Sequence, residues 1–223
     1  KLFKQNFPAH FIAEGLDQTR GWFYNMLVLS VGLFGKSAFR SVIVNGLVLA
    51  EDGQKMSKKL KNYPDPIAIM NIYGGYALRY YLLLSPAVRG EDLHFSEKDV
   101  QDIMNKVVVR LRNVYAFYEL YSKGKKIPDE NTLPRARHIL DRWIIVRFVE
   151  LVNKVTHGLD RYELDKAARP IVDFIEDLSV WYIRRSRDRF KGENRKDVIR
   201  VLATARFVLT GLTKIMAPFT PFI

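Results

Sequence analysis

Residues 52–66 read Asp-Gly-Gln-Lys-Met-Ser-Lys-Lys-Leu-Lys-Asn-Tyr-Pro-Asp-Pro, and this stretch decides how the rest of the chain is interpreted. Residues 55–59 place three lysines within five residues, directly after an Asp-Gly turn signal. Clustered ammonium groups on a loop attract a polyphosphate. Most short lysine clusters are nevertheless solvated loops. The interpretation therefore depends on the flanking residues.

The residues on both sides of this loop alternate between extended and helical patterns. Short β-branched or apolar runs at 10–13, 41–45 and 47–50 predict strands. Apolar residues at helical spacing predict a helix over 18–34. Asp65 and Pro66 suit the start of a helix that runs to about residue 72, and a further helix over 76–84 follows two glycines. The order strand–helix–strand indicates an α/β segment with a parallel sheet.

The second half of the chain is helical in pattern throughout. Stripes of apolar residues recur every three to four positions over 100–121, 140–155, 167–181 and 198–215. Four such stripes with short loops predict a helical bundle. Pro170 should start or kink the third helix. We therefore divide the chain into 1–85, a connector over 86–98, and a bundle over 99–223.

The composition favours a polyanionic partner. The formal net charge is +12, of which residues 1–98 carry +4 (12 basic, 8 acidic) and residues 99–223 carry +8 (24 basic, 16 acidic). The chain has no cysteine, and its four histidines are far apart, so no zinc site is expected. No apolar run reaches the ~20 residues of a membrane helix. We expect no membrane association and a reducing, cytoplasmic location.

A second motif follows the first predicted strand. Residues 13–23 read Ala-Glu-Gly-Leu-Asp-Gln-Thr-Arg-Gly-Trp-Phe and lie where a strand ends and a helix begins, which is where open α/β sheets bind ligands. Gly15 would let a ligand approach the backbone closely. Asp17 and Gln18 would offer an acceptor and an amide. The alternative is ordinary helix capping, with Asp17 as the N-cap.

These motifs occur in the order and spacing of one family. The run at 13–23, Val-Asn-Gly-Leu-Val-Leu at 44–49, Lys-Met-Ser-Lys at 55–58 and Asn-Tyr-Pro-Asp-Pro at 62–66 together resemble the isoleucyl-tRNA synthetases, which are class I aminoacyl-tRNA synthetases. The helical half agrees through residues 178–187 and 216–222. The resemblance implies the second half of a class I nucleotide-binding (Rossmann-like) fold, joined to a helical-bundle anticodon-binding domain.

The resemblance also implies partners and a role for each matching residue. The enzyme activates isoleucine with ATP and Mg²⁺ and transfers it to tRNA(Ile). Lys55 and Lys58 would hold the ATP phosphates as catalytic cations. Trp22 would form a wall of the isoleucine pocket, or would instead be a core aromatic. The residues expected to bind ATP or the adenylate are Glu14, Gly15, Asp17, Gln18, Asn45, Gly46, Met56 and Ser57.

The family's pattern is incomplete or altered at several points. Lys59 replaces the usual Ser or Arg, and Asn45 replaces a His that many bacterial members carry. The His-x-Gly-His motif and the editing domain are not in the sequence. We therefore interpret the chain as a fragment and expect it to be inactive by itself. A valine-specific class I synthetase and a truncated RNA-binding paralogue without catalysis are the alternatives.

A basic run marks the helical half as the predicted tRNA surface. Arg184, Arg185, Arg187, Arg189 and Lys191 spread around a helix, so only some of them can face one RNA. The others should pair with nearby acids; those considered are Asp173, Glu176 and Asp177. We expect Arg184 and Arg185 to contact phosphates.

Overall fold

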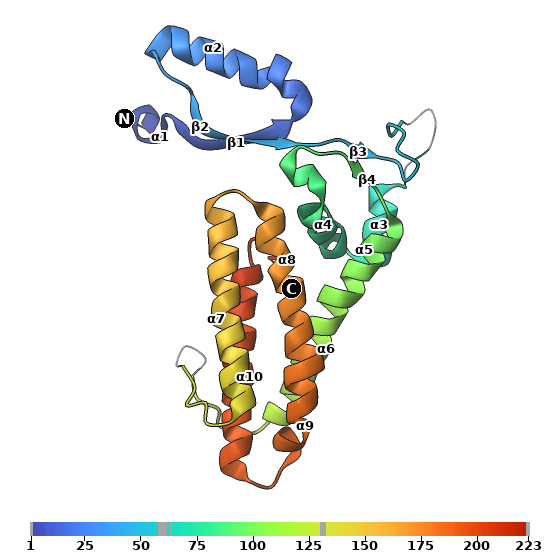
Figure 1. Ribbon diagram of the computed structural model, residues 1–223, viewed down its shortest axis with the longest axis vertical. Coiled ribbons are helices and arrows are strands. Elements are labelled where there is room, and N and C mark those ends of the chain that lie inside the picture. Colours follow the sequence, from blue (N-terminus) through green and yellow to red (C-terminus); the bar gives the residue numbers. More distant parts are fainter. Residues whose placement is uncertain (1, 58–61, 63, 130–132, 222–223) are drawn as a thin grey trace. The chain divides into compact units, whose positions relative to one another are not determined.

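The structure, a computed structural model, describes residues 2–57, 62, 64–129 and 133–221 (Figure 1). Within that part, the chain forms two compact units: residues 1–64 with 82–96, and residues 65–81 with 97–223. Helix α3 and most of α4 therefore belong to the helical unit, although the sequence pattern grouped them with the strands. The functional division at 1–85, 86–98 and 99–223 stays a prediction.

The first unit is built around a strand–helix–strand crossover. Strand β1 (Ala9–Gly15) pairs in parallel with β2 (Phe39–Asn45), and α2 (Trp22–Phe34) connects them. The parallel arrangement is as predicted. The helix predicted over 18–34 is interrupted, however: a 3₁₀ turn, η1 (Leu16–Arg20), precedes α2, and Gly21 separates the two.

A second parallel pair was only half predicted. Strand β3 (Val48–Leu49) pairs with β4 (Leu93–His94), which lies inside the stretch expected to be a connector. The 3₁₀ turn η2 (Pro86–Arg89) precedes β4. Residues 86–96 therefore pack as part of the compact first unit. A two-residue strand leaves little periodicity in the sequence, which is why it was missed.

The second unit is helical. Its elements are α3 (Pro66–Tyr73), α4 (Gly75–Leu84, shared with the first unit), α5 (Glu97–Ile103), η3 (Met104–Val109), α6 (Arg110–Ser122), α7 (Ile139–Asp160), α8 (Leu164–Glu176), η4 (Asp177–Ile183), α9 (Arg184–Lys191) and α10 (Arg195–Met216). The bundle is as predicted, and the start of α3 is too, because the Asp65 carboxylate accepts a hydrogen bond from the Ile67 amide.

Two details of the bundle were not predicted. Segments η3 and η4 are π-helical and continue into α6 and α9. Pro170 lies inside α8, which begins six residues earlier at Leu164, so the expectation of a helix start at the proline is wrong. The first turn of α8 lies N-terminal to Pro170, since the Ala167 amide donates to the Glu163 carbonyl.

Close helix crossings and buried side chains hold this unit together. A Cβ on Gly211 of α10 would lie 2.3 Å from the Phe148 ring of α7, and one on Gly158 of α7 would lie 2.9 Å from Ala167 of α8. The Tyr80 hydroxyl, fully buried, donates to the Ala168 carbonyl at 2.7 Å. Burial raises the pKa of Tyr80 well above its usual value, so the phenol stays neutral.

Candidate nucleotide and tRNA sites

The carboxyl ends of β1 and β2 bring two predicted site segments together. In the parallel register Glu14 lies opposite Val44, and Gly15 lies opposite Asn45. Glu14 and Asn45 are exposed at this edge. The carboxyl edge of a parallel pair is where ligands bind in open α/β sheets. Gly15 and Asn45, 30 positions apart in sequence, therefore lie side by side at this edge, and Glu14 precedes Gly15 on β1.

A chain of hydrogen bonds links the turn after β1 to the start of α2. Gln18 Nε2 donates to the Asp17 carboxylate at 2.9 Å, and Gln18 Oε1 accepts from the Trp22 amide at 2.9 Å. Gln18, not Asp17, thus meets the helix N-terminus, so the capping alternative for Asp17 is wrong. A Cβ on Gly15 would lie 2.7 Å from Asp17 Oδ1. A larger residue at position 15 would therefore clash with the Asp17 side chain, so local packing also favours glycine here.

Trp22 begins α2 and faces solvent. It is 43% exposed, whereas its neighbour Phe23 is buried at 6%. The two ring centroids are 5.9 Å apart. Trp22 is therefore not a core aromatic residue of this unit. Its role as a wall of an amino-acid pocket stays a prediction.

Gly46 is packed by protein rather than open to a ligand. A Cβ at this position would lie 1.8 Å from the Glu91 carbonyl oxygen, and the Gly46 amide donates to the Ala87 carbonyl at 2.8 Å. Only glycine allows the two backbones to approach this closely. The structure thus gives Gly46 a structural function, and its expected contact with ATP stays a prediction.

The loop that carries Lys55, Met56 and Ser57, called the lysine loop below, is held by the side-chain amide of Asn62. The sequence analysis gave this amide no role. Asn62 Oδ1 accepts from the Ser57 amide at 2.9 Å, and Asn62 Nδ2 donates to the Lys55 carbonyl at 3.2 Å. The backbone of Lys55 also forms an isolated antiparallel β-bridge with Leu49 of β3. Lys55 is exposed, while Met56 and Ser57 are half-buried. The prediction for Lys58 lies outside the described residues.

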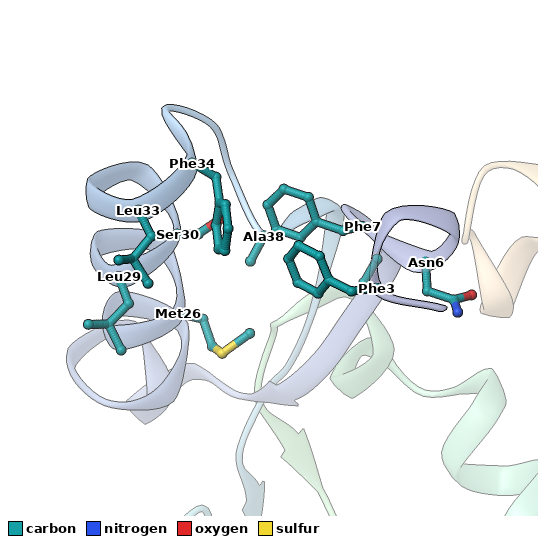
Figure 2. A pocket seen from close by; sticks show the side chains of 10 residues that line it. Phe3, Asn6, Phe7, Met26, Leu29, Ser30, Leu33, Phe34 and Ala38 are labelled. Carbon is teal, nitrogen blue, oxygen red and sulfur yellow. The ribbon is translucent and has the colours of Figure 1, made fainter. Parts of the chain in front are cut away.

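A separate apolar cavity of about 350 Å³ lies between α1 (Leu2–Asn6), α2 and the start of β1 (Figure 2). Phe3, Phe7 and Phe34 form its aromatic side, with centroids 4.8–5.1 Å apart. Its two polar side chains donate to backbone carbonyls, Asn6 to Leu2 and Ser30 to Lys36. Neither is placed to hold a phosphate, so this cavity is not the candidate site.

The described residues do not supply a metal cage. None of the groups of three or more His, Asp or Glu side chains that could hold a metal occurs among them. A Mg²⁺ ion that accompanies ATP keeps phosphate and water ligands, so it needs few protein ligands. The residues present are therefore compatible with magnesium carried in by the nucleotide.

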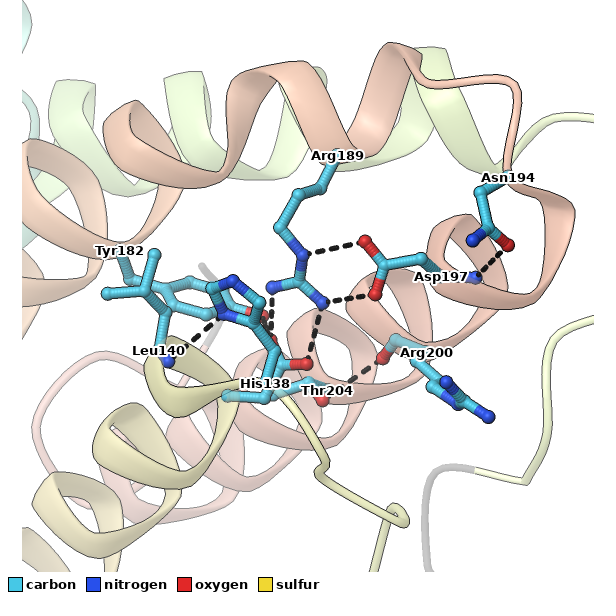
Figure 3. A network of polar contacts seen from close by, with 9 residues as sticks. His138, Leu140, Tyr182, Arg189, Asn194, Asp197, Arg200 and Thr204 are labelled. Carbon is cyan, nitrogen blue, oxygen red and sulfur yellow. Dashed lines mark hydrogen bonds and ion pairs between the residues drawn. The ribbon is translucent and has the colours of Figure 1, made fainter.

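The basic run on α9 divides into two kinds of arginine, and Figure 3 shows the second kind, Arg189. Arg184 and Arg185 are exposed. Arg189 instead donates to Asp141 of α7 from two nitrogens at 2.8 Å each, and to Asp197 of α10 at 2.9 Å. Asp141 also accepts from the Tyr182 hydroxyl at 2.9 Å. Arg189 is therefore a structural residue that joins three helices.

The acids that were expected to pair with the basic run form no ion pairs with it among the described residues. Asp177 pairs with Arg147 at 2.8 Å, and Glu176 pairs with Arg110 at 3.5 Å. The actual partners of Arg189 are Asp141 and Asp197. Asp141 lies on α7, far away in sequence, and Asp197 lies near the start of α10, the helix that follows α9. Burial by itself would lower the pKa of Arg189, but the hydrogen bonds to both carboxylates outweigh it and raise the pKa. The hydrogen bonding of Arg189 to Asp197 also lowers the pKa of Asp197.

Comparison with known proteins agrees with both parts. Residues 1–96 match the domain family described as tRNA synthetases class I (I, L, M and V), and residues 141–223 match the anticodon-binding domain of tRNA ligase. The fold is shared with LeuRS of Agrobacterium radiobacter K84, solved as a ternary complex with tRNA and LeuAMS (TM-score 0.74, 18% identity, 96% of this chain and 26% of that chain). It is also shared with Mycobacterium tuberculosis methionyl-tRNA synthetase in complex with methionyl-adenylate (TM-score 0.78, 21% identity, 100% and 44%).

The fold and the two matched domains thus define a segment of a class I aminoacyl-tRNA synthetase. Two curated relatives are named isoleucine--tRNA ligase. That of Protochlamydia amoebophila is 46% identical over 100% of this chain and 22% of the relative, and that of Chlamydia muridarum is 50% identical over 97% and 21%. The chain belongs to the isoleucine--tRNA ligase family and spans about a fifth of the length of these relatives.

No helix in the part of the chain that the structure describes is long and apolar enough to cross a bilayer.

Proposed function

We propose that this chain supplies part of the site at which isoleucine is activated by ATP and then transferred to tRNA(Ile), in the cytoplasm. In the first step a carboxylate oxygen of isoleucine attacks the α-phosphorus of ATP. The bond to the β-phosphate oxygen breaks, and pyrophosphate leaves. In the second step a ribose hydroxyl of the tRNA attacks the adenylate carbonyl, and AMP leaves. The relatives' names favour this function over the valine-specific and non-catalytic alternatives.

The observation that carries the proposal is the pairing of Gly15 with Asn45 at the carboxyl edge of β1 and β2. An adenylate placed at this edge would have its ribose hydroxyls near the Asp17 carboxylate. Its carbonyl would lie near Gln18, whose amide is already oriented by two hydrogen bonds. Preorganised polar groups of this kind stabilise developing charge without having to reorient. Trp22, exposed one turn further on, would contact the isoleucine side chain.

Lys55 would act on the phosphates. Negative charge builds on the transferring phosphoryl group and on pyrophosphate as the bond breaks, and a placed ammonium group stabilises it. Ser57 and Met56 support the loop, and Asn62 fixes the backbone on both sides of Met56. Lys58 would add a second cation. Mg²⁺ would be bound by the phosphates, which it neutralises further.

The helical unit would bind the tRNA. Residues 99–223 carry a net charge of +8. Arg184 and Arg185 are exposed on α9. Phosphate contacts by such residues give affinity that falls as salt is added.

The test of the activation site is titration of the chain with a non-hydrolysable isoleucyl-adenylate analogue, a sulfamoyl adenosine. We expect binding, weaker binding of the valyl analogue, and a loss of about fivefold in Asn45→Ala. Asn113→Ala, an exposed asparagine in the other unit, is the matched control and should bind as the unaltered chain does. Equal binding by the two asparagine variants would contradict the proposed site.

A further inference from the structure

Arg185 lies over the face of an aromatic ring, whereas its neighbour Arg184 has no such ring contact among the described residues. Its guanidinium carbon lies 4.1 Å from the centroid of the Trp181 ring. Trp181 also contacts Trp143 of α7, at 6.3 Å between centroids and 56° between planes, and it remains 45% exposed. The guanidinium therefore has a defined position on the surface of the helical unit.

The polar edge of this guanidinium is not used by the protein. No acid among the described residues pairs with Arg185, in contrast to Arg189, Arg147 and Arg110. A guanidinium that lies over a ring keeps N–H groups that the ring does not use, and these form a fork that matches the oxygens of a phosphate. Because the fork is already ordered, less conformational freedom is lost when a ligand binds.

Two further observations point to an RNA phosphate as the ligand. The neighbouring Arg184 and Arg187 are exposed on the same short helix, which makes the surroundings cationic. Trp181 lies in the π-helical segment Asp177–Ile183, and π-helical turns occur frequently at functional sites. A planar cation beside an exposed indole is also a combination that single-stranded or looped RNA contacts readily.

We infer that Trp181 and Arg185 bind an RNA phosphate as one unit, with Trp181 as a positioning residue that orients the Arg185 fork. The inference rests on the proposed tRNA-binding function of the helical unit and adds the residue that makes one of two adjacent arginines the stronger contact. Arg184, which has no ring beneath it among the described residues, contributes only its charge.

The test is a double-mutant cycle on tRNA(Ile) affinity, measured by fluorescence anisotropy at low salt with the 223-residue chain. Arg185→Ala should weaken binding about tenfold, the usual loss for a charge-assisted hydrogen bond. Trp181→Ala should weaken it about threefold, as expected for an exposed cation–π contact. The double variant should bind no more weakly than Arg185→Ala. Arg184→Ala is the matched control, and its effect should add to that of Trp181→Ala.

Four further measurements separate this role from a change in stability. Trp181→Phe, which keeps a ring, should restore most of the affinity. Arg185→Ala should reduce the slope of log affinity against log salt by about 1, and Trp181→Ala should reduce it less. Polyglutamate should compete for tRNA far less well than unlabelled tRNA. Thermal midpoints should show that every variant is folded.

The outcomes distinguish the two proposals. If the unaltered chain does not bind tRNA, both the tRNA-binding function and this inference are overturned. If the chain binds tRNA and Trp181→Ala binds equally well, or if the losses of Trp181→Ala and Arg185→Ala simply add, this inference alone is overturned. Effective competition by polyglutamate would likewise overturn the assignment of RNA as the ligand.

Discussion

The side-chain oxygen of Asn62 lies 2.9 Å from the backbone nitrogen of Ser57, and the same amide group donates to the carbonyl of Lys55. Asn62 thus fixes the backbone on both sides of Met56 in the lysine loop. In the described part of the loop, the side chain of Asn62 therefore ties the backbone of Lys55 to that of Ser57. Because the backbone of the exposed Lys55 is fixed in this way, Lys55 can present its charge to a phosphate with little ordering cost.

The first prediction concerns this amide. Asn62→Ala should remove about 1 kcal/mol of local stabilisation, since it deletes both hydrogen bonds. Hydrogen exchange at the Ser57 amide should then become about fivefold faster. Asn62→Asp keeps an acceptor for Ser57 but has no donor for Lys55, so it should exchange at an intermediate rate. Unchanged protection in Asn62→Ala would contradict the assigned bond.

The second prediction concerns Gly46. Gly46→Ala places a Cβ 1.8 Å from the Glu91 carbonyl oxygen, so one backbone segment has to move. We expect a loss of about 3 kcal/mol in the free energy of unfolding of the first unit, at the upper end for overpacking. Gly32→Ala in α2, where nothing lies within 4 Å, is the control and should be neutral or stabilising by up to about 1 kcal/mol. Urea denaturation followed at a first-unit probe measures both.

The third prediction concerns the buried arginine. Arg189→Ala leaves the Asp141 carboxylate, which is 0% exposed, without its cation. Breaking such a pair from one side costs about 3–5 kcal/mol. The exposed Arg187→Ala, two residues away, should change stability by no more than about 0.5 kcal/mol. Thermal or chemical denaturation of the helical unit measures the loss of stability in each variant. Similar losses in both variants would show that the network around Arg189 contributes little.

The fourth prediction is a pH dependence. Hydrogen bonding to Arg189 lowers the pKa of Asp197 in the folded chain. A lowered carboxyl pKa contributes stability above the unfolded pKa of about 4, and that contribution disappears as pH falls through the folded pKa. The unaltered chain should therefore lose more stability between pH 6 and pH 3 than Asp197→Asn does. Parallel pH curves for the two chains would be inconsistent with this linkage.

Local chemistry made several elements predictable from sequence. The helix after Asp65 follows from an N-cap and a proline at the first position, and both act within one turn. The meeting of Gly15 and Asn45 follows from the rule that parallel strands end at one edge. These inferences need only near neighbours or a general rule of sheet geometry.

Long-range contacts account for most of what the sequence did not predict. Strand β4 exists because Leu93 and His94 find Val48 and Leu49, about 45 residues earlier. The acid that pairs with Arg189 was not predicted, because Asp141 lies 48 residues away. Glycine at position 46 gave no indication that Glu91 would lie against it. The pairing of such residues is decided by packing, which periodicity and local propensity do not encode.

The register of β1 against β2 has a thermodynamic consequence. Gly15 and Asn45 are adjacent only while the two strands are paired, so the ligand surface proposed for them exists only in the folded unit. Any molecule that contacts both residues therefore shifts the folding equilibrium by mass action. A ligand at a hundred times its dissociation constant would add about 2.7 kcal/mol to the unfolding free energy. The strand pair thus makes the stability of the first unit a direct gauge of occupancy.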